Sequence, residues 1–279
     1  MGAMGQCLAR FLGKIPHYRI TLFTKDDWQA PQKLADQDLI IISVSIAITA
    51  KIIHQASQYL SSKTILSDLT SIKQKPMAAM LKYHTGPVVG MHPVFGPDIT
   101  HAQNHTIAYC HGRDEKSYQW FIDDLGTLKF TLKKMHAKAH DQAMDFIQGV
   151  EHFSTYCLGL FLSKNTPDIN TLYALASPIY KVKLNMLGRL FSHDPMLFAD
   201  IIMADADRTH IIKQYSELCR DEAIQVEQQN KALFIQQFNQ VKAWLGDFAE
   251  NARARSDQIL DNNQANMGGK NHEIKELSL

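Results

Sequence analysis

The change in hydrophobic periodicity near residue 136 constrains the fold of this chain more than any other feature of its sequence. Before that point, short strand-like runs alternate with helical stretches, and after it apolar residues recur only at helical spacing. Strands that alternate with helices are typical of a parallel, doubly wound sheet. We therefore predict an α/β domain over residues 1–135, an all-α domain over 136–262 and a flexible polar tail over 263–279.

The strands of the predicted sheet are short, and helices separate most of them. The strands are expected at Arg19–Phe23, Leu39–Val44, Thr64–Leu69, Val88–Met91, Thr106–Tyr109 and Lys129–Leu132. The helices are expected at Ile48–Leu60, Gln74–Tyr83 and Lys116–Leu125. In the second half, apolar stripes such as Phe234, Phe238, Val241 and Trp244 are expected to pack as core, within the domain or across a dimer.

Composition narrows the class of protein. The 29 basic and 28 acidic residues nearly cancel, which argues against a nucleic-acid or membrane-surface partner. The longest apolar run, Leu39–Ala50, is too short to span a bilayer, and no signal peptide is visible. The four cysteines lie far apart without metal-ligand spacing, so we expect a reduced, cytoplasmic protein without a structural zinc site.

The chain starts with a glycine pattern that suits a phosphate loop. Gly2-Ala3-Met4-Gly5 is the second half of Gly-x-Gly-x-x-Gly, in which the glycines let backbone N–H groups approach a pyrophosphate. The first glycine and the first strand would precede residue 1, so we expect a Rossmann-like domain that lacks its first strand. Downstream, Thr24 is neutral, Lys25 suits a 2′-phosphate and Asp26 suits a ribose hydroxyl, which leaves NAD and NADP both open.

A rigid turn presents a single histidine. His92 lies within Gly-Met-His-Pro-Val-Phe-Gly-Pro-Asp at 90–98, where glycines and prolines on both sides exclude a helix interior. One imidazole held at a strand end is a common way to present a catalytic group. A lone histidine in a turn is more often structural, however, so its role depends on its neighbours.

Other polar residues share the expected carboxyl edge of the sheet with His92. Ser71 and Lys73 follow one strand and Ser43 lies at the end of another, while His140 and Asp141 begin the first long helix of the second half. Arg189 lies in an apolar helical stretch without an acidic residue nearby in sequence. Since a desolvated arginine needs an anionic partner, we expect an anionic ligand or a distant carboxylate there.

Several segments together resemble a known family. They are, in order, 68–73 (Asp-Leu-Thr-Ser-Ile-Lys), 90–98, His140-Asp141-Gln142, Ser177-Pro178-Ile179-Tyr180, Gly188-Arg189-Leu190-Phe191 and Ala199-Asp200-Ile201-Ile202-Met203. Each is similar to prephenate dehydrogenase, most of all to the dehydrogenase part of bifunctional chorismate mutase–prephenate dehydrogenases. The resemblance extends to Asn262.

The resemblance implies an N-terminal domain that binds NAD, with NADP as the alternative, and a C-terminal domain that forms a homodimer. It implies prephenate as the small-molecule substrate and tyrosine as a candidate inhibitor. His92 matches the catalytic histidine, and Arg189 matches the arginine that binds a substrate carboxylate. The other implied substrate-site positions are Ser71, Lys73, His140, Lys181 and Phe198. The expected cofactor-site positions are Gly2, Ala3, Met4, Gly5, Thr24, Ser43 and Val44.

Two positions depart from the family pattern. Lys181 stands where relatives carry a second arginine, which keeps the charge but loses the bidentate fork. Ser43-Val44-Ser45 stands where relatives have Ser-Val-Pro, which alters the turn beside the cofactor.

The implied reaction is oxidative decarboxylation of prephenate to 4-hydroxyphenylpyruvate on the route to tyrosine, with neutral His92 as the base that accepts the ring hydroxyl proton. Two alternatives remain open at this stage. One is an arogenate dehydrogenase, which carries out the same ring chemistry on an amino-acid side chain. The other is a catalytically impaired, N-terminally truncated dimer.

Overall fold

The computed structural model describes residues 2–268, which divide into two compact units. The first comprises residues 2–154 and 193–212, and the second comprises residues 155–192 and 213–268. Among these residues, no helix is long and apolar enough to cross a membrane. The division places the α/β part and the start of the all-α part in one unit.

The first unit contains a five-stranded sheet in the order β1-β2-β3-β4-β5. Its strands are β1 (Leu39–Ile42), β2 (Ile65–Asp68), β3 (Val88–Pro93), β4 (Thr106–Arg113) and β5 (Thr131–Lys134). Five of the six predicted strands are thus confirmed within a few residues. The carboxyl ends of β2 and β3 lie side by side, because these two strands are parallel.

The predicted parallel pairing is confirmed for three of the four strand pairs and was wrong for the fourth. β4 runs antiparallel to β3, while β1 pairs with β2, β2 with β3 and β4 with β5 in parallel. A parallel neighbour needs a crossover, usually a helix, whereas an antiparallel neighbour needs only a loop. The segment between β3 and β4 contains Gly96 and Pro97 and forms no helix, so the chain returns antiparallel.

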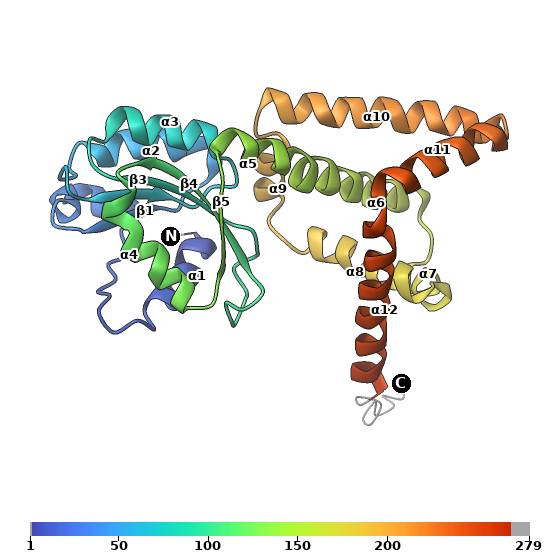
Figure 1. The fold of residues 1–279 in the computed structure, drawn as a ribbon, viewed down its shortest axis with the longest axis horizontal. Coiled ribbons are helices and arrows are strands. Elements are labelled where there is room, and N and C mark those ends of the chain that lie inside the picture. Colours follow the sequence, from blue (N-terminus) through green and yellow to red (C-terminus); the bar gives the residue numbers. More distant parts are fainter. Residues whose placement is uncertain (1, 269–279) are drawn as a thin grey trace. The chain divides into compact units, whose positions relative to one another are not determined.

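Helices cover both faces of the sheet, as Figure 1 shows: α2 (Ile46–Ser57) and α3 (Gln74–Tyr83) on one face, α1 (Ala3–Leu12) and α4 (Glu115–Thr127) on the other. Successive residues of β2 point to opposite faces of the sheet. Ile65 packs with Tyr118 of α4, and Leu66 packs with Ile53 of α2. This alternation follows from the two-residue period of a strand, and it builds two cores around one sheet.

The predicted strand Arg19–Phe23 is absent, and this segment has no regular secondary structure. A strand exists only when its backbone groups pair with a neighbour. Among the described residues, β1 pairs with β2 alone, so no ladder reaches Arg19–Phe23. Two 3₁₀ helices, Lys25–Gln29 and Pro31–Leu34, then lead into β1.

A nearly continuous helix follows β5. It consists of α5 (Ala137–Met144), a π-helical turn over Asp145–Val150 and α6 (Glu151–Asn165). The first unit also includes α9 (Pro195–Ile202) and the first residues of α10 (Ala206–Glu227). π turns within α-helices are rare, and those that occur are often found at functional sites.

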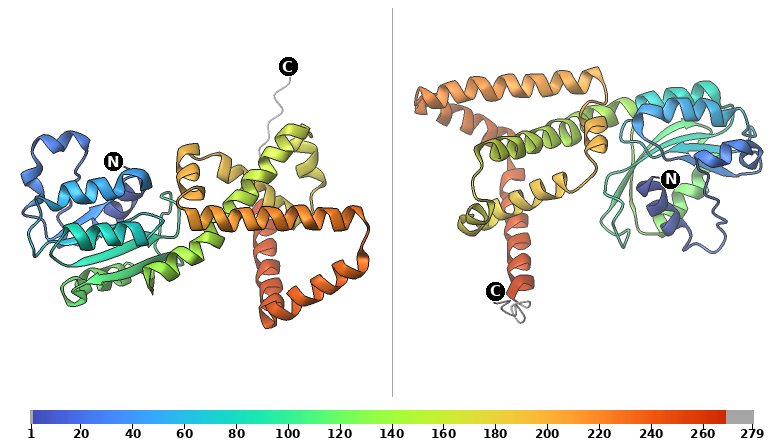
Figure 2. Two further views of the ribbon diagram at one scale, coloured as in Figure 1. Left: turned by 90° about the horizontal axis from the view of Figure 1, so that it is seen from above. Right: turned by 180° about the vertical axis from the view of Figure 1, so that it is seen from behind.

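The second unit is helical. It contains most of α6 and α10 together with α7 (Ile169–Leu175), α8 (Pro178–Phe191), α11 (Lys231–Leu245) and α12 (Asp247–Gly268). Figure 2 shows α10 turning into α11, and a hydrogen bond from Gln237 Nε2 to Glu222 Oε1 (2.8 Å) joins them. The predicted tail begins inside α12, which continues to Gly268; residues 269–279 lie outside the described part of the chain.

The apolar stripe of α11 is not packed as core within the described residues. Its aromatic residues are more than half exposed, with Phe234 at 59%, Phe238 at 63% and Trp244 at 81%. Of the two ways of burying this stripe that the sequence left open, packing within the domain is therefore not observed among the described residues.

Candidate active site

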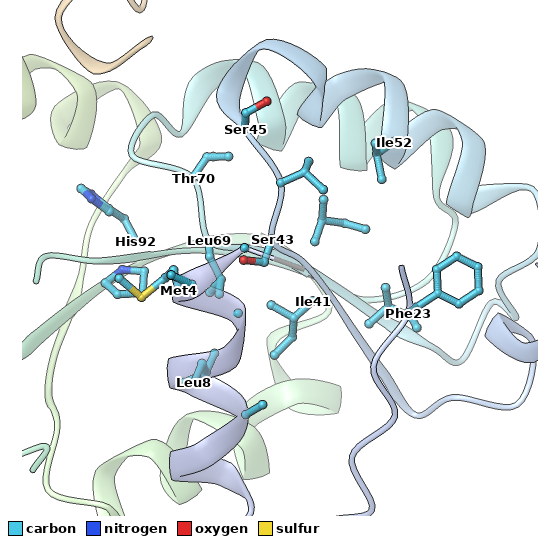
Figure 3. A pocket seen from close by; sticks show the side chains of 18 of the residues that line it. Met4, Leu8, Phe23, Ile41, Ser43, Ser45, Ile52, Leu69, Thr70 and His92 are labelled. Atoms are coloured by element: carbon cyan, nitrogen blue, oxygen red, sulfur yellow. The ribbon is translucent and has the colours of Figure 1, made fainter. Parts of the chain in front are cut away.

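A hollow of about 2120 Å³ opens within the first unit, along β1 and above the ends of β2 and β3. Figure 3 shows Met4, Ser43, Thr70 and His92 among the side chains that line it. All seven residues predicted to hold the cofactor lie on its wall: Gly2, Ala3, Met4, Gly5, Thr24, Ser43 and Val44. The structure thus brings together residues that the sequence separates by up to 42 positions, from Gly2 to Val44.

The N-terminus of α1 faces this hollow. Gly2 is its N-cap residue and provides no side-chain cap, and the first turn carries no acidic residue. The first N–H groups of a helix have no partner within the helix, and they carry a partial positive charge. This end of α1 therefore suits a pyrophosphate.

The segment after Phe23 presents one anion and one cation to the hollow. Lys25 and Asp26 are both exposed and line it. Asp27 is engaged elsewhere, because its carboxylate accepts hydrogen bonds from the Thr24 backbone N–H (2.8 Å) and from the Thr24 hydroxyl (2.9 Å). These two hydrogen bonds, one from the backbone and one from the side chain of Thr24, are the main reason why the pKa of Asp27 is lowered.

His92 lies at the carboxyl end of β3, as predicted, and lines the hollow although only 4% of it is exposed. Ser71 follows the adjacent strand β2 and also lines the hollow. The Ser71 hydroxyl is buried and has no hydrogen-bond partner among the described residues. A buried hydroxyl without a partner is costly, so this one is suited to a ligand.

A chain of hydrogen bonds runs behind His92. Its Nδ1 atom lies 2.9 Å from His140 Nε2, and His140 Nδ1 lies 2.8 Å from Asp141 Oδ1. Asp141 also accepts the backbone N–H of Lys73 at 2.7 Å and that of Gln74 at 2.9 Å, so its carboxylate is ionised and acts only as an acceptor. His140 must then donate from Nδ1 and accept at Nε2.

The same reasoning fixes the proton of His92. Since His140 Nε2 accepts, neutral His92 carries its proton on Nδ1 and leaves the lone pair of Nε2 free to act as a base. Burial, together with the nearby His140, Lys73 and Arg208, holds the pKa of His92 well below its ordinary value. Burial would raise the pKa of Asp141, but the hydrogen bonds from His140, Gln74 and Lys73 outweigh it and lower that pKa.

Lys73 and His140 support the site from behind, and neither belongs to the wall of the hollow. The Lys73 side chain is fully buried, and its ammonium group donates to Asp68 Oδ2 at 2.5 Å and to the Met91 carbonyl at 2.6 Å. Asp68 also accepts from the backbone N–H and the hydroxyl of Thr70. This ion pair ties the end of β2 to β3, beside His92.

Phe198 lies on α9 in the first unit and lines the hollow. Its ring contacts that of His152, with the centroids 5.1 Å apart in a T-shaped arrangement. His152 also lines the hollow and was not singled out from the sequence, because nothing beside it in the chain marks it.

Arg189 and Lys181 lie on α8 in the second unit. Arg189 is exposed, and no carboxylate among the described residues forms an ion pair with it. The expectation of a desolvated arginine is therefore not met within its unit. Lys181 is half-buried, and its ammonium group lies 5.5 Å from the centroid of the Tyr173 ring.

Known proteins are similar to this chain in sequence and in fold. Residues 19–106 match the family model for the prephenate dehydrogenase nucleotide-binding domain, and residues 136–245 match that for the prephenate dehydrogenase dimerization domain. The T-protein of Enterobacter agglomerans is 40% identical over 260 residues, which cover 93% of this chain and 69% of that protein. The T-protein of Haemophilus influenzae is 36% identical over 266 residues, which cover 95% and 70%.

Among solved structures, prephenate dehydrogenase from Aquifex aeolicus superimposes with a TM-score of 0.58 at 16% identity, over 86% of this chain and 84% of that one. A second structure of that enzyme, in complex with hydroxyphenyl propionate and NAD+, gives 0.57 at 15% identity, over 86% and 83%. At these identities the likeness concerns the fold alone. Two family models in sequence order and relatives at 36–40% identity lead to one conclusion: the chain belongs to the prephenate dehydrogenase family.

Proposed function

We propose that this chain, as a prephenate dehydrogenase of tyrosine biosynthesis, uses the Nε2 atom of neutral His92 as the base in the oxidative decarboxylation of prephenate to 4-hydroxyphenylpyruvate. The observation that carries this proposal is the hydrogen-bond chain from Asp141 through His140, which leaves Nε2 of His92 unprotonated on the wall of the hollow. Both family models bear the prephenate dehydrogenase description, which favours prephenate over arogenate.

The proposed reaction removes one hydride, transfers one proton to and from His92, and releases CO2. His92 Nε2 accepts a hydrogen bond from the ring hydroxyl and draws its proton away as the carbon–hydrogen bond at the same carbon breaks. A nicotinamide cofactor supplies the acceptor for that hydride. The bond to the ring carboxylate then breaks, CO2 leaves, and the released electron pair completes the aromatic ring. The phenolate oxygen takes its proton back from His92, which returns to the neutral form.

The hollow fits such a cofactor. The uncapped first turn of α1 would hold the pyrophosphate, with Ser43 and Val44 at the end of β1 beside it. We infer NAD as the cofactor, since Asp26 is available for a ribose hydroxyl. Lys25 is the residue that would accept NADP instead, so turnover with each cofactor is the direct comparison.

For the substrate, we infer that Arg189 binds a carboxylate, by the family resemblance and because its exposed guanidinium meets no carboxylate among the described residues. Ser71 and Phe198 are proposed as further substrate contacts, and Lys181 as a second cation. Lys73 and His140 are proposed as positioning residues, because both are fully buried behind His92.

We further propose that the protein is a homodimer in which the exposed aromatic residues of α11 are buried. The four free cysteines suit the reducing cytoplasm, where we place the enzyme. Feedback inhibition by tyrosine is part of the same proposal and is tested by adding tyrosine to the assay.

The decisive experiment is a two-substrate, two-cofactor assay. The purified protein is given prephenate or arogenate with NAD or NADP, and formation of the reduced nicotinamide is followed together with release of CO2. We expect turnover with prephenate and NAD to exceed the other three combinations. Preference for arogenate would overturn the substrate assignment, and nicotinamide reduction without CO2 would overturn the reaction.

A further inference from the structure

The π turn between α5 and α6 directs one polar side chain at the base of the reaction. Gln148 lies in this turn and lines the hollow, and its Nε2 atom is 3.5 Å from Nε2 of His92. Since His92 Nε2 carries the lone pair, the Gln148 amide is the donor of this long contact. The other polar atom of the amide, Oε1, is buried and has no partner among the described residues.

A buried ion pair holds the π turn in place. The fully buried Arg208 donates from Nε to Asp145 Oδ1 at 3.3 Å, and from Nη1 to the Ile201 carbonyl at 2.5 Å. Gly149 makes room for this arginine, because a Cβ atom there would lie 2.9 Å from Arg208 Cγ. Arg208 therefore contacts Asp145 before Gln148 and Gly149 after it. The π turn also rotates the side chains that follow it about the helix axis, compared with a regular α-helix.

We propose that Gln148 is a substrate contact, which rests on the proposed function: its amide hydrogen-bonds the oxygen of the ring hydroxyl whose proton His92 accepts. In the free protein the amide donates weakly to His92. When the hydroxyl enters, its O–H group donates to His92 Nε2 and its oxygen accepts from Gln148. As the proton leaves, this oxygen becomes more negative, so the contact is stronger in the transition state than in the bound substrate.

The shape-matched variant Gln148→Met tests this role, with Gln142→Met as its control, since Gln142 is an exposed glutamine on α5. We expect Gln148→Met to lower kcat for prephenate about 10- to 100-fold, as loss of a donor to a developing negative charge does. KM for prephenate and the dissociation constant of NAD, measured by fluorescence titration, should change less than about threefold. The control should behave as the wild type.

A second variant gives a readout that a structural role would not change. His92 is already surrounded by Lys73, His140 and Arg208, which all disfavour its protonated form. In Gln148→Glu a carboxylate replaces the amide beside Nε2 and favours the protonated form, so the acidic limb of kcat/KM should move to higher pH.

The outcomes are distinct. A fall in kcat for Gln148→Met together with the upward move for Gln148→Glu supports the proposal. Wild-type kcat in Gln148→Met, while the wild type itself turns over prephenate, overturns the role of Gln148 alone. Failure of both the wild type and Gln142→Met to oxidise prephenate overturns the proposed function and this inference with it.

Discussion

Replacement of Asp141 by asparagine tests whether the buried hydrogen-bond chain sets the proton of His92. The carboxylate of Asp141 accepts from the backbone N–H groups of Lys73 and Gln74 and from His140 Nδ1. An asparagine side chain has one acceptor oxygen and one donor NH2 group, so it cannot satisfy all three donors. If the NH2 group faces His140, the proton of His140 moves to Nε2, and His92 must then accept at Nδ1 and protonate Nε2, which removes the base.

The size of the effect follows from the loss of the base. A positioned general base contributes about 10²- to 10⁴-fold to the rate, so kcat should fall by a factor in this range, as expected for His92→Asn. KM for prephenate should stay near the wild-type value, because Asp141 is not on the wall of the hollow. One backbone N–H group also loses its acceptor, which lowers the free energy of unfolding by about 1–3 kcal/mol.

The assay is initial-rate formation of the reduced nicotinamide, combined with urea unfolding of the same samples. Asp124→Asn is the matched control, since Asp124 accepts hydrogen bonds from Tyr18 (3.0 Å) and His17 (3.1 Å) and takes no part in the hydrogen-bond chain. The control should lose stability without a comparable loss of kcat. Wild-type kcat in a folded Asp141→Asn protein would refute the reasoning about the proton on His92.

Three further changes have defined outcomes. His92→Asn should lower kcat about 10²- to 10⁴-fold. The base works only when His92 is neutral, and the pKa of His92 is lowered, so kcat/KM of the wild type should fall as the pH drops through a midpoint below 6.5. An unchanged kcat or a midpoint above 6.5 would contradict this assignment. Arg189→Gln should raise KM for prephenate about 10- to 100-fold with little change in kcat, and a normal KM would exclude the arginine from substrate binding. Gly149→Ala should destabilise the protein by about 1–3 kcal/mol in urea unfolding, since its Cβ meets Arg208 at 2.9 Å; equal stability would show that Arg208 moves freely.

Sequence reasoning placed His92 at a strand end and the residues proposed for the cofactor near the same hollow, because both predictions depend on local signals. Glycine and proline punctuation marks the turn after β3, and the glycine pair marks the start of α1. The direction of β4 was missed although the absence of a helix between Met91 and Thr106 carried the signal. Strand pairing depends on residues far apart in the chain, and periodicity does not report it.

The roles of the polar residues were harder to predict, because burial and partners are tertiary properties. Lys73 was expected at the substrate site, yet its ammonium group is buried against Asp68 and does not line the hollow. The sequence places Asp141 at the start of its own helix, whereas its carboxylate accepts from the first backbone N–H groups of α3. The π turn that carries Gln148 was not predicted, and Arg208, which pairs with Asp145 in this turn, lies 63 residues further along the chain than Asp145.

The attachment of Asp141 to the first N–H groups of α3 has a consequence for the order of events in unfolding. One carboxylate both anchors α5 on α3 and determines the tautomer of His92, so detachment of α5 from α3 would remove the base that we propose while every helix is still intact. Enzymatic activity should therefore disappear at a lower denaturant concentration than the helical circular dichroism signal. The rate of turnover should therefore report whether α5 is docked on α3.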